Sequence, residues 1–384
     1  MRRQPQIRFA GFTDDWEQYK LGDIADRYDN LRIPITAVNR VPGNTPYYGA
    51  NGIQDYVDGY THEGEYILIA EDGANDLKNY PVQYVSGRVW VNNHAHVLQG
   101  KSKIADNKFL KYYISQANIE PFLVGSSRAK LNAEVMMKIE IYLPINIKEQ
   151  QKIGKFLSQL DNLITLYQRK YDKLLNFKKA MLEKMFPRAG KNEPGIRFGG
   201  FISAWEQCKL GDVAEFNPTA VLPDSFEYVD LESVSGAEMI THRTETKATA
   251  PSRAQRLAQS GDLFYQMVRP YQKNNYLFEK IDGKYVFSTG YAQLRPTING
   301  YFLLTLVQLD QFVKDVLDKC TGTSYPAISA KNLADIDINI PSKSTESNQI
   351  GKFFCKLDDL IILQHHKLEK LQNIKKSLLE KMFV

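Results

Sequence analysis

The chain has 384 residues, 43% of them hydrophobic and 24% charged, as expected for a globular protein of two or three domains. Its formal net charge of +5 permits nucleic-acid binding without requiring it. Three widely separated cysteines exclude a disulfide framework or zinc signature and fit a reducing cytosol, and no stretch resembles a membrane helix or a signal peptide.

A motif near the N-terminus occurs twice. Residues 7–26 read IRFAGFTDDWEQYKLGDIAD and residues 196–215 read IRFGGFISAWEQCKLGDVAE, with 13 of 20 positions identical. Three aromatic pairs are expected to anchor the motif, namely Phe9/Phe198, Phe12/Phe201 and Trp16/Trp205. The repeated sequence KLGD is expected to begin a folded unit.

The segments that follow the two motifs differ from each other. Apolar and polar residues alternate between Gly, Asn and Asp in both, over residues 46–75 and 87–98 in the first unit and over 260–278 and 287–296 in the second, which predicts short strands joined by turns. In each half of the chain, similar flanking sequences enclose a different central segment. This pattern indicates one scaffold that presents two different recognition surfaces, because binding residues often lie on loops held by a rigid scaffold.

Each unit is expected to close with a strand. The sequences IEIYLP (139–144) and IDINIP (336–341) place apolar residues at every second position and end at a proline. A Gly-Ser-Ser or Gly-Thr-Ser sequence precedes each of them, at 125–127 and 322–324.

A long helix is predicted over residues 149–186, where apolar residues recur at steps of 3 and 4. Asn146, three residues before Glu149, suggests a capping box at its start. The sequence PRAGKNEPG (187–195) ends the helix. Lys178 interrupts the apolar seam, either to fix the register of the helix or simply to reach solvent.

The long helix is also repeated. Residues 346–383 match residues 149–186 at 21 of 38 positions, and Lys375 repeats the interruption at Lys178. This agreement indicates internal duplication. Each helix needs an apolar partner for its seam, and the other copy can supply it.

Aromatic and hydrogen-bonding side chains of the unmatched segments are candidates for DNA contact, because Asn and Gln can pair with adenine and Arg or Lys with guanine. In the first unit they are Tyr47, Tyr48, Asn51, Arg88, Asn92, Asn93, His94 and His96. In the second unit they are Gln266, Arg269, Tyr271, Gln272, Lys273, Asn274, Asn275 and Tyr276. The stretches around the Gly-Ser/Thr-Ser sequences add Ser127, Arg128, Lys130, Ser324, Tyr325 and Lys331 as phosphate or base contacts.

Catalytic and metal signatures are weak. His94 and His96 could begin a metal site, but no third ligand is evident, so no metal is expected. Asp224, Glu245 and Lys247 fit the loose pattern of a metal-dependent nuclease, which is the alternative function. Dinucleotide-binding, P-loop and nucleophile-elbow motifs are absent from the sequence. The chain is therefore expected to recognise a ligand without catalysing a reaction itself.

The duplicated frame, the helix ends FKKAMLEKMF and IKKSLLEKMF, and the sequences PYYGANGIQDYVDGY, VRPYQKNNY and STGYAQLRP make the whole chain resemble the specificity subunit of type I DNA restriction–modification enzymes. The resemblance implies an α+β fold with an internal pseudo-two-fold repeat. It places target-recognition domains at 1–148 and 188–343, and spacer helices at 149–187 and 344–384 that pair as an antiparallel coiled coil.

The same resemblance implies the function. Each domain would read one half of a bipartite, asymmetric site in double-stranded DNA, and the helices would span the unread spacer. Two methyltransferase subunits and two motor-nuclease subunits are the implied partners, in the cytoplasm, for DNA methylation and defence against phage. S-adenosylmethionine, ATP and Mg²⁺ would then belong to those partners, leaving this chain with no cofactor and no catalytic residue.

Overall fold

The computed structural model of the chain describes residues 4–125, 129–280, 284–322 and 324–384. Its contacts divide it into two compact units, each of which contains part of both long helices. Unit 1 is Met1–Arg169 with His366–Val384, and unit 2 is Lys170–His365. Both are mixed α/β folds. Among the helices of the described residues, none is long and apolar enough to cross a bilayer.

Unit 1 is built on a six-stranded sheet in the order β2-β7-β5-β6-β3-β4, in which β3 pairs with β6 in parallel and the other neighbours are antiparallel. Its strands are β2 (Ala25–Arg27), β3 (Pro42–Gly49), β4 (Gly52–Val57), β5 (His62–Ala70), β6 (Val82–Val91) and β7 (Ala95–Gly100). A small hairpin joins β8 (Leu123–Val124) to β9 (Lys130–Leu131). The helical elements are α1 (Leu21–Ile24), η1 (Asp29–Leu31), η2 (Ala37–Asn39), α2 (Asn107–Gln116), η3 (Glu120–Phe122) and α3 (Ala133–Met136).

Unit 2 holds two four-stranded sheets, β12-β21-β18-β19 and β16-β13-β20-β17. The strands are β12 (Ala214–Phe216), β13 (Ser225–Val229), β16 (Arg243–Thr246), β17 (Ala254–Leu257), β18 (Leu263–Gln266), β19 (Tyr276–Leu277), β20 (Tyr285–Ser288) and β21 (Tyr291–Pro296), with the pair β14 (Val234–Ser235) and β15 (Glu238–Met239) beside them. The helical elements are η4 (Leu210–Asp212), η5 (Pro270–Gln272), α5 (Gly300–Val307), α6 (Asp310–Asp318) and α7 (Ala330–Ala334). The short strands predicted for the unmatched segments are confirmed in both units.

The repeated N-terminal motif pairs with the strand that closes each unit. In unit 1, β1 (Glu17–Lys20) lies antiparallel to β10 (Glu140–Leu143), and in unit 2, β11 (Glu206–Lys209) lies antiparallel to β22 (Asp337–Ile340). The closing strands confirm the prediction from alternating apolar residues, since Ile141 and Ile338 are buried. The two ends of each unit are thus tied to each other, which leaves the differing segments between them.

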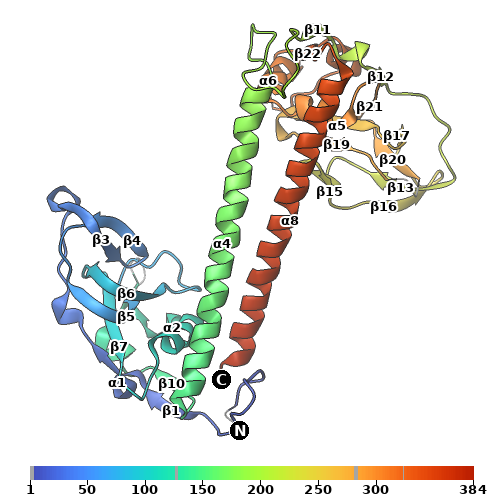
Figure 1. Cartoon of the computed structure of the whole chain (residues 1–384). Coiled ribbons are helices and arrows are strands. Elements are labelled where there is room, and N and C mark those ends of the chain that lie inside the picture. Colours follow the sequence, from blue (N-terminus) through green and yellow to red (C-terminus); the bar gives the residue numbers. More distant parts are fainter. Residues whose placement is uncertain (1–3, 126–128, 281–283, 323) are drawn as a thin grey trace. The chain divides into compact units, whose positions relative to one another are not determined.

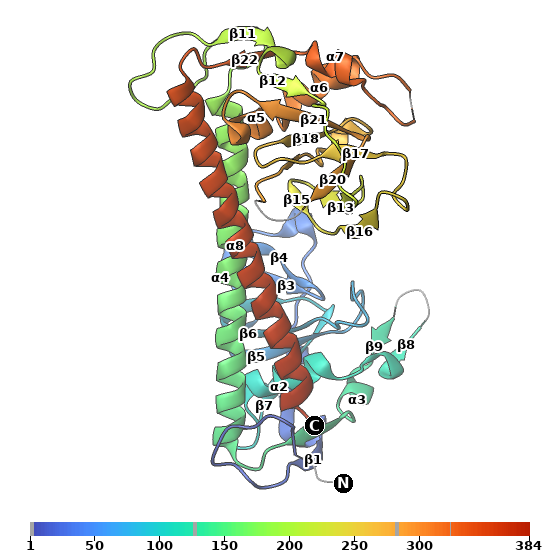
Figure 2. The same cartoon turned by 90° about the vertical axis from the view of Figure 1, so that its right-hand side faces the viewer.

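The two long helices are α4 (Ile147–Met185) and α8 (Ser344–Met382), each of 39 residues and unbroken (Figure 1 and Figure 2). Each is therefore ~58 Å long at ~1.5 Å per residue. In unit 1 the start of α4 lies beside the end of α8, since Lys375 pairs with Asp161. In unit 2 the end of α4 lies beside the start of α8, since Lys178 pairs with Asp358. The helix segments are antiparallel within each unit.

The same three aromatic residues fill the core of each unit. In unit 1, Trp16 packs on Phe109 of α2 and on Phe383, with ring centroids 5.5 and 6.4 Å away. In unit 2, Trp205 packs on Phe302 of α5 and on Phe186, both at 5.8 Å. The predicted anchoring role of the two tryptophans is confirmed, because both are buried. Phe109 and Phe302 are therefore structural equivalents.

The start of α4 differs from the predicted capping box. The Asn146 side chain does cap the helix, accepting a hydrogen bond from the Lys148 N–H at 3.0 Å. Glu149, however, bonds to Arg8 through both carboxylate oxygens, at 2.6 and 2.8 Å, rather than to the backbone of Asn146. Arg197 and Glu346 repeat this bidentate pair at 2.8 and 2.7 Å in unit 2. Each arginine–glutamate pair joins the N-terminal motif to the first turn of a long helix. Both glutamates are buried.

Candidate nucleic-acid interface

Two loops meet at an equivalent place in each unit. In unit 1 the chain that leaves β5 is bridged to β9, with an isolated bridge between Asp72 and Lys130 and a 2.7 Å bond from the Leu131 N–H to the Glu71 carbonyl. In unit 2 the chain that leaves β18 is bridged to residues 326–328, where the Arg269 N–H donates to the Pro326 carbonyl at 2.8 Å and Val268 pairs with Ala327. In the sequence, the repeated Gly-Ser/Thr-Ser residues directly precede the second segment of each pair. These loop pairs bring together candidates from distant parts of the sequence.

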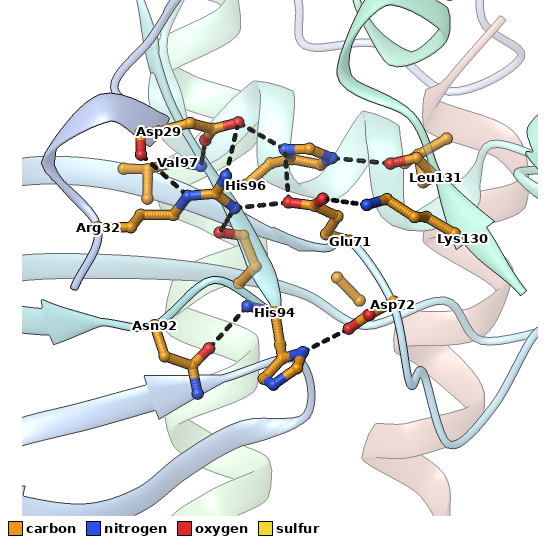
Figure 3. Close-up of polar contacts among 12 residues, drawn as sticks. Asp29, Arg32, Glu71, Asp72, Asn92, His94, His96, Val97, Lys130 and Leu131 are labelled. Carbon is orange, nitrogen blue, oxygen red and sulfur yellow. Dashed lines mark hydrogen bonds and ion pairs between the residues drawn. The ribbon is translucent and has the colours of Figure 1, made fainter. Parts of the chain in front are cut away.

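A partly buried ionic network supports the loop pair of unit 1 (Figure 3). His96 lies 2.7 Å from Asp29 through Nδ1 and 2.8 Å from the Leu131 carbonyl through Nε2. Glu71 accepts from Arg32 at 2.7 Å and from Lys130 at 2.8 Å. Burial alone raises the pKa of both carboxyl groups, but the hydrogen bonds outweigh it and hold both pKa values below their usual range. The network fixes β9, η1 and the end of β5 against one another.

Asp29, Glu71 and His96 are close enough to share a metal ion, with one ligand atom of each lying within 4.8 Å of the others. The residues around them do not fit an ion. Both ring nitrogens of His96 already have protein partners, the Asp29 carboxylate at 2.7 Å and the Leu131 carbonyl at 2.8 Å. Arg32 and Lys130 already neutralise Glu71, so each of the three groups is engaged within the network.

The two histidines named as a possible metal fragment have separate partners. His94 precedes β7 and bonds to Asp72 through Nδ1, whereas His96 lies within β7 and bonds to Asp29 (Figure 3). The His94 N–H also bonds to the Asn92 side chain at 2.9 Å. No local sequence pattern pointed to Asp29, Arg32, Glu71 or Asp72, because these partners come from segments far apart in the chain.

The other unit 1 candidates divide by exposure. Tyr47, Asn92 and His96 are buried, and the Tyr47 hydroxyl bonds the Ile35 carbonyl at 3.2 Å, so these side chains support the fold from within. The exposed Asn51 holds the loop after β5, donating to the Gly73 carbonyl at 2.9 Å. The remaining described candidates are exposed or half-buried: Tyr48, Arg88, Asn93, His94 and Lys130. Ser127 and Arg128 lie outside the described residues.

The loop after β18 has an unusual backbone in unit 2. Arg269 and Lys273, which flank η5, have φ angles of 55° and 56°, a region that non-glycine residues seldom adopt. Such strain concentrates at functional sites. The Arg269 guanidinium lies 4.4 Å from the ring centroid of Tyr325, on the opposite loop of the pair. Tyr271 and Tyr325 are 50% and 64% exposed, so arginine and two tyrosines form an accessible cationic and aromatic surface.

The remaining unit 2 candidates mostly support that loop. Gln266 and Asn275 are buried; the Gln266 side chain donates to Gln272 at 2.8 Å, and the Asn275 side chain accepts from the Gln266 N–H at 2.8 Å. Lys273 bonds the Gln308 carbonyl and Asp310, and Asn274 accepts from the Gly236 N–H at 2.8 Å. Tyr276 is half-buried against Phe287, while Gln272, Ser324 and Lys331 are exposed. DNA contact by any of the 22 candidate residues stays a prediction.

Two of the three residues of the nuclease alternative have structural partners in the described part of the chain. Lys247 donates through its backbone N–H to the Asp224 carbonyl at 2.9 Å, directly beyond the paired ends of β13 and β16. The Glu245 carboxylate is engaged by Arg243 at 3.0 Å and by Thr249 at 2.9 Å. Within the described ranges, these residues are not among the acidic, histidine or cysteine groups close enough to share an ion.

A profile of the type I restriction modification DNA specificity domain matches residues 13–176 and 202–373, one match in each half of the chain. The chain belongs to this family. The putative type I restriction enzyme specificity subunit S.HindORF215P of Haemophilus influenzae is 46% identical over 153 residues, which cover 40% of this chain and 39% of that relative. The type I restriction enzyme MjaVIII specificity subunit of Methanocaldococcus jannaschii is 21% identical over 95% of this chain and 91% of its own length.

A solved structure supports the fold of this specificity-family member. The crystal structure of the type I restriction–modification system S subunit from M. genitalium matches with a TM-score of 0.71, covering 99% of both chains at 16% identity. The two long helices and the two mixed α/β units agree with the fold that the sequence predicted.

Proposed function

We propose that this chain is the non-catalytic subunit that gives a type I restriction–modification complex its DNA specificity, with one half of a bipartite site read by each unit. The observation that carries the proposal is the equivalent loop pair in two frames of common origin, one built on His94, Asn51 and Lys130 and the other on Arg269, Tyr271 and Tyr325. Different side chains on equivalent surfaces lead us to expect two different half-sites, hence an asymmetric target.

Accessible planar and cationic groups suit this role. Arginine can pair with guanine through two hydrogen bonds, and exposed asparagine can do the same with adenine. Arg269, Tyr271 and Tyr325 in unit 2, and Asn93 and Lys130 in unit 1, are the described side chains we assign to bases or phosphates. The buried candidates, among them Gln266 and His96, instead hold these loops in place.

Partner binding is assigned to the long helices. Leu163 and Leu166 of α4 are 45% and 47% exposed, and Leu360 and Leu363, their copies in α8, are 47% and 46% exposed. Apolar side chains left open at two equivalent places suit one kind of partner bound twice. We assign these surfaces to two methyltransferase subunits, with motor-nuclease subunits joining that assembly in the cytoplasm. S-adenosylmethionine, ATP and Mg²⁺ are then assigned to the partners.

The test is to co-express the chain with its methyltransferase subunit and map methylated bases across a genome. The expected result is one asymmetric motif of two half-sites separated by a spacer of fixed length. A single contiguous motif, or no motif, would contradict the proposal. Incubation of the isolated chain with DNA and Mg²⁺ separates the nuclease alternative, because cleavage that disappears in Asp224→Ala would support an enzyme.

A further inference from the structure

Asp161 of α4 joins three elements of unit 1. Its carboxylate lies 2.6 Å from the Lys375 ammonium of α8, 2.6 Å from the Tyr112 hydroxyl of α2, and 3.3 Å from the Lys111 ammonium of α2. The side chains of Asp161 and Lys375 are 30% and 28% exposed, so the ion pair is largely sheltered from water. One carboxylate thus connects the recognition fold to both long helices.

Unit 2 repeats the arrangement. Asp358 of α8 lies 2.6 Å from the Lys178 ammonium of α4 and 2.7 Å from the Tyr301 hydroxyl of α5. Asp161 and Asp358 are copies, and so are Lys178 and Lys375, each separated by 197 positions in the sequence. These lysines are the two interruptions of the apolar seams, and both reach an aspartate on the other helix instead of solvent. We call each set of aspartate, lysine and tyrosine a clamp.

The tyrosines of the two clamps are not copies of each other. Tyr112 follows Phe109 by three residues, whereas Tyr301 directly precedes Phe302, and the packing on Trp16 and Trp205 makes these phenylalanines equivalent. Both hydroxyls nevertheless reach the equivalent aspartate, at 2.6 and 2.7 Å. Duplication explains why a residue recurs at the same position of both units. It does not explain why the aspartate of each unit is bonded by a tyrosine from a different position of α2 and α5. This difference indicates that the contact itself has a role.

A clamp distinguishes one helix register from its neighbours. Apolar seam residues tolerate a shift of one step, because one leucine replaces another. A shift of α8 by one seam step would bring Leu371 or Leu378 to Asp161 in place of Lys375, and take the half-buried Lys375 ammonium away from the carboxylate that it pairs with. An ion pair in a helix seam adds little net stability, but breaking it is costly, which is how polar seam residues select a register.

We propose that the two clamps fix the register of the helix pair and seat each recognition fold on it, so that Asp161 and Asp358 are positioning residues for the length of the DNA spacer. The inference rests on the proposed function, because spacer length has meaning only for a bipartite site. The contacts found for the clamp carboxylates among the described residues are to α2, α5 and the long helices, so the clamps act through the placement of α2 and α5 on the helices.

The experiment compares methylation by the complex of this chain with its methyltransferase subunit, on a library of sites whose spacers differ by one base pair. Asp161→Asn, Lys375→Met, Asp358→Asn and Lys178→Met each remove one side of a clamp. The charge exchange Asp358→Lys with Lys178→Asp restores an ion pair in the unit 2 clamp; unit 2 is chosen because Lys111, 3.3 Å from Asp161, would repel a lysine at position 161. Glu183→Gln and Glu380→Gln remove an exposed carboxylate at copied positions of the two helices and serve as matched controls.

Wild type and both controls are expected to methylate one spacer length. The single variants should lose at least ~10-fold of the preference over spacers one base pair longer or shorter, with the half-site sequences unchanged, and the charge exchange should recover most of it. Lower methylation at one unchanged spacer length, following the loss of thermal stability in each variant, would overturn the inference and leave the clamps as stabilising contacts only.

Failure of the proposed function gives a different result. In that case the wild-type complex methylates no bipartite site, and the spacer role of the clamps falls with it. If wild type shows one bipartite motif and Asp161→Asn keeps the same spacer preference, the function stands and the clamp inference fails. The unfolding midpoint of the charge exchange, measured on the whole chain, checks the register separately; it should exceed those of both single variants.

Discussion

Gly154 lies near the start of α4, where a helix would ordinarily gain stability from alanine. A Cβ at this position would come within 2.8 Å of the Phe109 backbone nitrogen, and one at Gly351 within 2.9 Å of the Phe302 nitrogen. The first turns of α2 and α5, capped by Asp106 and Asn299, therefore pack directly on the long helices. The glycines are the residues that permit this approach.

Gly154→Ala is therefore expected to destabilise unit 1, although alanine raises helix propensity by ~1 kcal/mol. The added methyl group meets backbone that cannot move away, and such overpacking costs roughly 1–3 kcal/mol. Chemical denaturation of the whole chain measures the change. Gly199→Ala is the control, because a Cβ there meets nothing within 4 Å. Equal stability of the two variants would show that α2 can shift at no cost.

The Asp161 clamp should be visible in the pH dependence of stability. Burial raises the pKa of Asp161, but hydrogen bonds from Lys375 and Tyr112 and the nearby Lys111 outweigh it, so the pKa lies below its usual range. A carboxyl group with a depressed folded pKa stabilises above its unfolded pKa of ~3.9, and that contribution is lost as the pH falls through the folded value. The stability difference between wild type and Asp161→Asn should be constant from pH ~7 to ~5 and shrink below pH ~4. Urea unfolding measured at each pH tests this, and parallel curves down to pH ~3 would contradict it.

The residue types in the sequence were sufficient to name candidates for DNA contact. They did not indicate which of these side chains are exposed to solvent. Gln266, Asn275, Asn92, Tyr47 and His96 have the right chemistry, yet all are buried in the structure. Exposure depends on which loops fold back on each other, and the partners of His96 lie on η1, directly after β5 and on β9, far apart in sequence. No local pattern contains that information. Arg269 and Tyr325 could likewise be named singly, but their contact depends on a bridge between distant loops.

At the scale of elements, periodicity was sufficient for the long helices and the closing strands, because each pattern repeats over many residues or ends at a proline. Partners were harder to predict. The pairing of β1 with β10, and the bond between Arg8 and Glu149, join segments more than a hundred residues apart. The duplication marked these segments as important without saying that they touch. The structure gives the repeated segment IRF a role, because its arginine, Arg8 or Arg197, bonds to a glutamate in the first turn of a long helix.

Arg8→Ala is expected to lower the stability of unit 1 by roughly 3–5 kcal/mol, because it leaves the carboxylate of Glu149 buried and unpaired. The Glu149 side chain is only 1% exposed, so water does not replace the guanidinium. The double change Arg8→Met with Glu149→Met removes both charges and should cost less. Denaturation gives the two free energies, and hydrogen exchange should rise first at the start of α4. Arg8→Ala costing no more than the double change would show that the pair is not sheltered.

At the scale of the whole molecule, the chain holds two reading folds of common origin with separate cores. Trp16 and Trp205 each lie in the core of their own unit, and every contact described for Arg269 lies within unit 2. A change in one reading loop should therefore leave the other half-site unaffected. The net charge of +5 adds only a sequence-independent, salt-dependent attraction to DNA.

Arg269→Ala is expected to reduce discrimination in one half-site by roughly 1–3 kcal/mol, the range for one base contact, and Asn93→Ala in the other half-site by a similar amount. Since the two residues share no partner, the double variant should show the sum of the two effects within ~0.5 kcal/mol. Relative methylation rates on a library of single-base changes in both half-sites measure all three variants.

Lys331→Ala, on the exposed surface of α7, tests the phosphate assignment in the same assay, because losing a phosphate contact weakens binding to all sequences equally and reduces the salt dependence of binding. If Arg269→Ala weakened both half-sites equally, the arginine would hold the backbone instead of reading a base, and the base contact in unit 2 would have to come from Tyr271, Gln272 or Tyr325.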